Sequence, residues 1–247
     1  MTCRPAAVWL ILILAGLLSG CQPAEPAQTA QPNEVIWVQV TPSARPATAA
    51  VQACASQIDG IVVRIEERYP AAAGPGMLIR IGEPITGEPG DDAFMAQIAE
   101  ERLGVVLHPD NPAASLTTDE IRDLFSGRTP NWSDLGGEDL PVKVWVLPEA
   151  DETQLAFDTE VLDGLLPAPD AGLAPDPAAV REAVLADPAA IGLLPAGWPH
   201  DDLTLILLGV RLPVLVTAPN APTGAEAELV ACLQGETGQA ALGVAYP

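Results

Sequence analysis

The chain has few cations. Its 11 lysines and arginines stand against 33 aspartates and glutamates, which gives a formal net charge of −22. A surface of this sign repels nucleic acids and anionic lipid headgroups, so we expect no nucleic-acid partner. The acids are scattered along the chain, which is typical of a solvated surface.

Histidines and catalytic motifs are also scarce. The two histidines, His108 and His200, each lie beside a proline, and neither has a clear nucleophile partner. No Cys/His spacing indicates zinc, and the glycines between residues 74 and 90 form neither a P-loop nor a dinucleotide fingerprint. We therefore expect no metal site, no cofactor and no enzymatic activity. An acid–base pair among the carboxylates is the alternative left open.

The apolar run near the N-terminus, residues 6–18, is shorter than the roughly 20 residues of a membrane-spanning helix. With Arg4 before it and small residues after it, the run is typical of a secretory signal. The sequence LSGC at 18–21 resembles the bacterial lipobox, in which the cysteine, here Cys21, is lipidated and becomes the new N-terminus. An ordinary signal peptide with a chance cysteine is the alternative.

These features predict a signal peptide over residues 1–20 and a lipidated flexible tether over 21–33, rich in Pro, Ala and Gln. Each buried methylene of an acyl chain contributes about 0.8 kcal/mol, so two or three chains hold a protein on a membrane. We expect an extracytoplasmic protein, lipid-anchored to the bacterial cell membrane on its outer or periplasmic side.

Two cysteines remain once Cys3 leaves with the signal and Cys21 takes the lipid. Cys54 and Cys232 are an even pair in an oxidising compartment, which predicts a disulfide between them. Two buried free thiols are the alternative.

Strands and helices alternate along the chain, which predicts the α/β class with mostly parallel pairing. The predicted strands are 35–40, 60–65, 103–107, 142–146, 191–194, 203–208 and 212–216. The predicted helices are 44–58, 91–101, 116–125, 151–162, 176–186 and 225–242.

A series of short motifs begins at Gly104. In chain order they are GVVLHPDNP (104–112), LT (116–117), FSG (125–127), NW (131–132), GG (136–137), AIG (190–192) and GQ (238–239). Their order and spacing resemble those of the phosphate-type periplasmic substrate-binding proteins of ABC transporters. The glycines permit tight turns, so the motifs mainly indicate how this part of the chain folds.

The resemblance implies a two-lobed, type II periplasmic-binding-protein-like fold with ligand in the cleft between the lobes. It places lobe 1 at 34–103 and 201–247 and lobe 2 at 104–200. It also implies a monomer that carries a small solute to an ABC permease in the membrane.

In the family, one phosphate-binding loop reads Arg-Glu-x-Gly-Ser-Gly-Thr at a helix start, where free N–H groups suit an anion. Here Leu147 replaces the arginine, Asp151 the serine and Glu152 the second glycine, whereas Thr153 matches. The change removes a bidentate phosphate partner and adds two like charges. We therefore expect a ligand other than simple phosphate.

The candidate ligand residues are Thr41 and Ser43 after the first strand, and Asp151, Glu152 and Thr153 in the later loop. Ser43 could instead be only a helix N-cap, and the two acids only helix-start acids. If the acids contact ligand, they favour a cationic or hydroxyl-rich solute, although an oxyanion stays open. A cleft that has lost its ligand is the third possibility.

The sequence thus predicts an extracytoplasmic solute-binding lipoprotein of an ABC-type importer, resembling the phosphate-binding components. A non-transport sensing or interaction lipoprotein on the same fold is the alternative.

Overall fold

The computed structural model describes residues 34–69, 76–83, 93–113 and 115–246. The predicted signal peptide and tether, and with them Cys21, lie outside the described residues. Within the described ranges, no helix combines the length and the hydropathy needed to cross a bilayer.

One sheet unites the described strands, in the order β2-β1-β3-β8-β4-β7-β5-β6. The strands are β1 Glu34–Val40, β2 Ile61–Glu67, β3 Met77–Ile81, β4 Phe94–Leu107, β5 Lys143–Val146, β6 Gly172–Leu173, β7 Ala190–Pro195 and β8 Thr204–Ala218. Four of the seven pairings are parallel, and the three antiparallel ones join β3, β8, β4 and β7 at the centre. The predicted α/β class with mostly parallel pairing is confirmed.

The helices are α1 Thr48–Ala55, α2 Thr118–Phe125, α3 Glu152–Glu160, α4 Pro177–Leu185, α5 Gly224–Gln234 and α6 Glu236–Ala245, with 3-10 turns η1 Arg45–Ala47 and η3 Trp132–Leu135. The start of α2 shows why local sequence places some of them well. Thr117 accepts from the backbone of Glu120, and the Glu120 side chain accepts from the backbone of Thr117, which together form a capping box.

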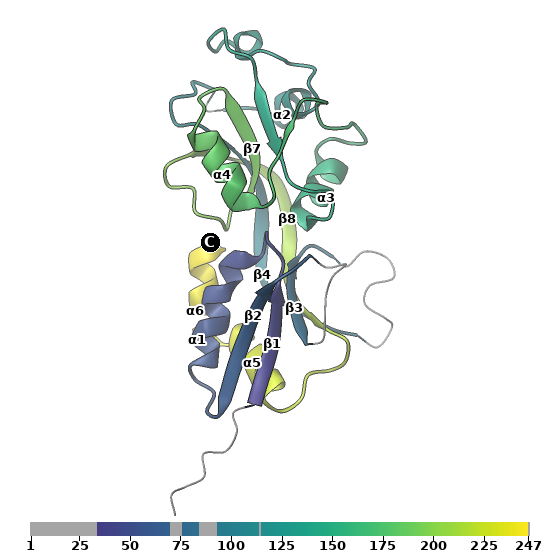
Figure 1. The fold of residues 1–247 in the computed structure, drawn as a ribbon, viewed down its shortest axis with the longest axis vertical. Coiled ribbons are helices and arrows are strands. Elements are labelled where there is room, and N and C mark those ends of the chain that lie inside the picture. The colour runs from purple at the N-terminus through teal and green to yellow at the C-terminus, as the bar shows by residue number, and fades with distance from the viewer. Residues whose placement is uncertain (1–33, 70–75, 84–92, 114, 247) are drawn as a thin grey trace, which may run out of the picture. The chain divides into compact units, whose positions relative to one another are not determined.

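Two hydrophobic cores lie along the sheet. The first, here called the α1/α6 core, packs α1, α5 and α6 against β1, β3 and parts of β4 and β8; it includes Ile36, Val38, Ile79, Val216 and Leu229. The second, the α2/α4 core, packs α2, α3 and α4 against β5, β7 and the other ends of β4 and β8; it includes Val105, Leu124, Phe125, Phe157 and Leu193. Figure 1 shows β4 and β8 running from one core to the other.

Several segments differ from the sequence-based expectation. The helix predicted over 44–58 is a 3-10 turn, η1, followed by the shorter α1, and β3 lies where no strand was predicted. The helix predicted over 91–101 is wrong, because residues 94–101 form the first half of β4 and pair antiparallel with β8. The strands predicted at 203–208 and 212–216 are one strand, β8. The helix predicted over 225–242 is broken at Gly235 into α5 and α6. In β4, pairing with β8 outweighs the helix preference of its Ala, Gln and Glu residues.

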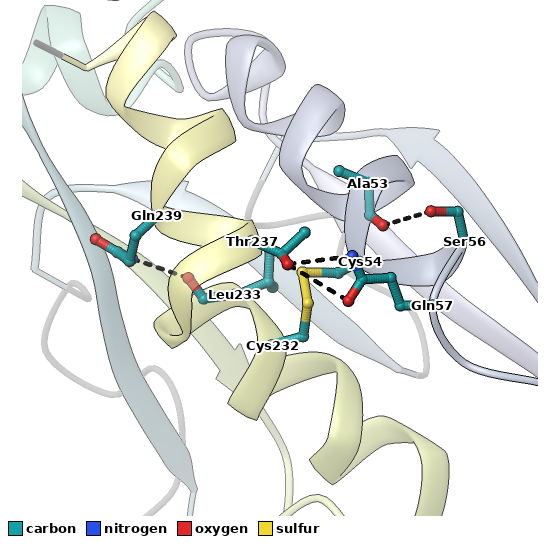
Figure 2. Close-up of a disulfide and its surroundings, with 8 residues drawn as sticks. All are labelled: Ala53, Cys54, Ser56, Gln57, Cys232, Leu233, Thr237 and Gln239. Atoms are coloured by element: carbon teal, nitrogen blue, oxygen red, sulfur yellow. Dashed lines mark hydrogen bonds between the residues drawn. A yellow bond between two sulfur atoms is a disulfide. The ribbon is translucent and has the colours of Figure 1, made fainter.

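A disulfide joins Cys54 of α1 to Cys232 of α5, with 5.7 Å between the Cα atoms and a sequence separation of 178. It is the pairing that the sequence predicts, and it lies inside the α1/α6 core. Figure 2 shows the Gln57 side chain beside it, donating to the hydroxyl of Thr237 at 3.1 Å. The two contacts fix α1 against the C-terminal pair of helices.

Candidate functional site

The five candidate ligand residues lie together where the end of β1 meets the N-terminus of α3. All are buried: Glu152 exposes 6% of its surface, and the other four expose none. The set comprises Thr41, Ser43, Asp151, Glu152 and Thr153. Burial of this many polar groups at the junction of the two cores requires specific partners or a bound solute.

Asp151 is the N-cap residue of α3. Its Oδ1 atom accepts from the backbone N–H of Thr153 at 2.9 Å and of Gln154 at 3.4 Å. Both of its oxygens lie 2.8 Å from the donating hydroxyl of Ser43, on the other core. Burial raises the pKa of Asp151, and these hydrogen bonds act against the rise. The side chain is therefore both a helix cap and a link between the cores.

Ser43 is not a helix N-cap. The Ala44 position precedes η1 and the Ala47 position precedes α1, and neither helix has a side-chain cap. The Ser43 hydroxyl instead donates to Asp151, and its carbonyl accepts from the indole N–H of Trp198 at 2.9 Å. Ser43 is thus held on two sides by residues of the α2/α4 core, and the N-cap alternative is wrong.

Arg80 of β3 is a member of the cluster that the sequence analysis missed. It exposes 3% of its surface, and its Nε lies 3.9 Å from Oε1 of Glu152. Gln39 of β1 pairs with Leu78 of β3, so two residues further on Thr41 and Arg80 come to the same face of the sheet. The only signal in the sequence is one arginine within the apolar strand MLIRI.

Glu152 is the acid of the cluster whose side-chain oxygens remain available for hydrogen bonds. Neither of its carboxylate oxygens has a hydrogen-bond partner among the described residues, and the same holds for the hydroxyls of Thr41 and Thr153. Burial, followed by the charge of Asp151, raises the pKa of Glu152 to about 8, although the charge of Arg80 lowers it. At neutral pH the side chain is thus mainly a neutral acid that can both donate and accept.

Other contacts join the two cores around this cluster. Arg45 of η1 pairs with Asp176, the N-cap residue of α4, at 2.9 Å, and its guanidinium stacks 4.8 Å from the ring centroid of Trp198. The Tyr69 hydroxyl donates to the carbonyl of Pro175 at 2.8 Å. These contacts add to the link that Ser43 and Asp151 make between the two cores.

A separate cavity of about 740 Å³ lies between η1, α6 and the segment after β7. Its lining is mainly apolar, and it includes none of the candidate ligand residues; it comprises Arg45, Pro46, Ala49, Ala196, Gly197, Trp198, Pro199, His200, Asp201, Ala241, Val244 and Ala245. Its size does not make it the better candidate for a polar solute, because the unpartnered buried oxygens of Thr41, Glu152 and Thr153 lie in the cluster instead.

The arrangement offers a small polar solute two carboxylates, one guanidinium and several hydroxyls in a dry setting. In the part of the chain that the structure describes, no group of three or more His, Cys, Asp or Glu side chains could hold a metal ion. The chemistry of the cluster is that of hydrogen bonding and charge pairing.

Residues 83–238 match the model of the PBP superfamily domain. The match covers more than half of the chain, and the chain belongs to this superfamily.

Particular relatives agree with this assignment. Over 107 residues the chain is 31% identical to the phosphate-binding protein PstS of Bacillus subtilis (strain 168), a match that covers 43% of this chain and 35% of that protein. The chain thus matches about a third of the length of this relative.

Solved structures confirm the two-lobed fold. A protein of Clostridium perfringens assigned as a phosphate ABC transporter substrate-binding protein, with bound phosphate, superposes with a TM-score of 0.75 at 17% identity, covering 86% of this chain and 98% of its own. An ABC-type phosphate transport receptor of Vibrio cholerae gives 0.63 at 15% identity, covering 85% and 97%. At such identities the likeness concerns the fold, which is the predicted type II periplasmic-binding-protein-like fold.

Proposed function

We propose that this protein is an extracytoplasmic solute-binding lipoprotein of an ABC-type importer, similar to phosphate-binding components but with a ligand other than simple phosphate. The α1/α6 and α2/α4 cores are the two lobes, with boundaries near residues 103/104 and 200/201. Binding draws them together by hinge motion about β4 and β8. The closed monomer then docks on a permease, and no chemical step is involved.

The observation that carries this proposal is the buried carboxylate of Glu152, whose two oxygens lack hydrogen-bond partners among the described residues. An unsatisfied buried polar group costs about 1–3 kcal/mol, so a site that keeps one gains by taking a ligand that satisfies it. The buried hydroxyls of Thr41 and Thr153 also lack hydrogen-bond partners among the described residues. Together they support a solute site between the two cores.

The polar groups of the cluster favour one class of ligand. Asp151 and Glu152 provide two acids, of which Glu152 is mainly protonated at neutral pH, and Arg80 provides one base at 3.9 Å from Glu152. A phosphate dianion would add negative charge beside Asp151 at low effective dielectric, which is costly. A cationic or hydroxyl-rich solute would instead donate hydrogen bonds to Glu152 and leave the Asp151 cap intact.

A solute panel tests this function. Thermal unfolding of residues 22–247 is measured with inorganic phosphate, sulfate, glucose, spermidine and divalent metal ions, each in excess. A ligand of the folded state is expected to stabilise it by about 2.7 kcal/mol at one hundred times its dissociation constant. We expect stabilisation by a hydroxylated or cationic solute and none by phosphate. Stabilisation by phosphate would contradict the assigned ligand class.

The lipid anchor is tested in a bacterial host that expresses the full chain. Replacing Cys21 with alanine is expected to move the protein from the membrane fraction to the soluble fraction, because the acyl chains have no other attachment site. Cys3→Ala is the matched control, since it also removes a cysteine of the leader but leaves Cys21. Equal membrane association of Cys21→Ala and wild type would contradict the anchor.

The alternative is a sensing or interaction lipoprotein on the same fold. It is favoured by the direct hydrogen bonds that join the two cores, from Ser43 to Asp151 and from Arg45 to Asp176. Such links hold the cores together through the protein's own side chains. If no solute in the panel raises the unfolding midpoint, this alternative becomes the better account.

A further inference from the structure

The N-terminus of α3 has the donors of an oxyanion site. The backbone N–H groups of Thr153 and Gln154 point out of the first turn, and the hydroxyl of Ser43 faces them from the other core. The helix dipole adds partial positive charge at the same point. In this chain the acceptor that these three donors share is the carboxylate of Asp151.

The surroundings also suit an oxyanion. Arg80, which exposes 3% of its surface, places a guanidinium beside Glu152. The buried hydroxyls of Thr41 and Thr153 lack hydrogen-bond partners among the described residues, so both can turn toward a bound group. Apart from the two acids, each polar side chain of the candidate set is a potential hydrogen-bond donor to an anion.

We propose that the carboxylate of Asp151 occupies the place at the start of α3 where a free oxyanion would otherwise bind. Asp151 and Glu152 together then make the site select against free oxyanions. The inference rests on the proposed function in taking this cluster as the solute site. It goes beyond that function by explaining why oxyanions are excluded: the Asp151 carboxylate already occupies their binding place at the N-terminus of α3.

The geometry indicates that oxyanions are excluded because the Asp151 carboxylate occupies their place. Both Asp151 oxygens lie 2.8 Å from the Ser43 hydroxyl, and Oδ1 also accepts from the helix N–H groups. A free oxyanion at this place would need the same donors and would overlap the carboxylate. Removing the negative charge while keeping the atoms should therefore leave the site closed to oxyanions. Removing the atoms should open it.

Two double variants of equal charge separate these effects. Asp151→Ser with Glu152→Gln shortens the side chain at 151, whereas Asp151→Asn with Glu152→Gln keeps its size. Serine, asparagine and aspartate are all good N-cap residues, so α3 should be retained in both. Inorganic phosphate and sulfate are the probes, and binding to residues 22–247 is measured by isothermal titration at pH 7.

We expect the serine variant to bind inorganic phosphate at least about 100-fold more tightly than the asparagine variant and the wild type, as charge-assisted hydrogen bonds to the freed donors predict. Equal binding by the serine and asparagine variants would show that charge alone excludes oxyanions and would overturn the inference. Binding by the wild type would overturn it too, as would folded variants that bind neither probe.

Circular dichroism and a cooperative unfolding transition establish that each variant is folded. If the serine variant does not fold, Asp151→Gly with Glu152→Gln is used in its place. It also removes the carboxylate from the start of α3, and glycine is accepted at an N-cap as well. The proposed function fails separately, when the wild type is stabilised by no solute in the panel. Gain of phosphate binding by the serine variant would still support the role assigned to Asp151 in that case.

Discussion

Replacing Glu152 with glutamine is expected to remove much of the pH dependence of stability between pH 5.5 and 8. The pKa of Glu152 rises from 4.5 to about 8 on folding, chiefly through burial. In this window the folded protein holds a proton that the unfolded chain has released, so the free energy of unfolding falls as pH rises. The slope is up to about 1.4 kcal/mol per pH unit for one proton, which amounts to about 2 to 3 kcal/mol over the window.

Urea unfolding at several pH values between 5.5 and 8 measures this effect. Glu101 of β4 contributes a smaller fall of the same sign, because burial raises its pKa to about 7 although its carboxylate accepts from the backbone of Gly197. Glu149→Gln is the matched control, since Glu149 is an exposed acid three residues from Glu152. An unchanged slope in Glu152→Gln, or wild-type stability that rises toward pH 8, would contradict a buried, mainly protonated Glu152.

Loss of the disulfide is expected to lower the free energy of unfolding by about 2 to 4 kcal/mol. The bond closes a loop between residues 178 apart and joins α1 to α5, so the reduced unfolded chain gains much conformational freedom. Cys54→Ala and Cys232→Ala should each show this loss in urea unfolding under non-reducing conditions.

The double variant is the control for this prediction. Because each single substitution already removes the bond, Cys54→Ala with Cys232→Ala should cost little more than either alone. A reductant should destabilise the wild type but not the double variant. Losses that add in the double variant, or a wild type indifferent to reductant, would show that the two cysteines do not stabilise the fold as a pair.

The elements that the sequence predicted well have local signals. The helix predicted over 116–125 is α2, and its start is fixed by the capping box of Thr117 and Glu120. The strand predicted over 142–146 is β5, and the helix over 176–186 is α4, which begins after the N-cap Asp176. In these cases the residues that define an element are its own neighbours in sequence.

The errors lie where distant pairing decides the structure. Phe94 to Glu101 contains good helix formers, yet it becomes a strand because β8, more than a hundred residues away, pairs along its length. β8 itself continues through Arg211 and Pro213, which local rules treat as interruptions. No window of adjacent residues contains this information.

Most of the candidate site could be predicted from the sequence, and Arg80 could not, for the same reason. The motif comparison led to Asp151, Glu152 and Thr153, and the loop after the first strand led to Thr41 and Ser43. Arg80 was missed because only strand register places it beside Glu152. From the sequence alone, the two acids indicate a negatively charged site. Because Arg80 adds a positive charge and the pKa of Glu152 is raised, the cluster carries less negative charge than the sequence suggests.

The most direct test of the account asks whether solute is held at Glu152. The solute that most stabilises wild-type residues 22–247 in the thermal panel is measured again on Glu152→Ala, which removes the polar atoms, and on the exposed control Glu149→Ala. We predict that the stabilisation is largely lost in Glu152→Ala and fully kept in Glu149→Ala. Equal stabilisation of both variants and the wild type would place the solute elsewhere and contradict the proposed site.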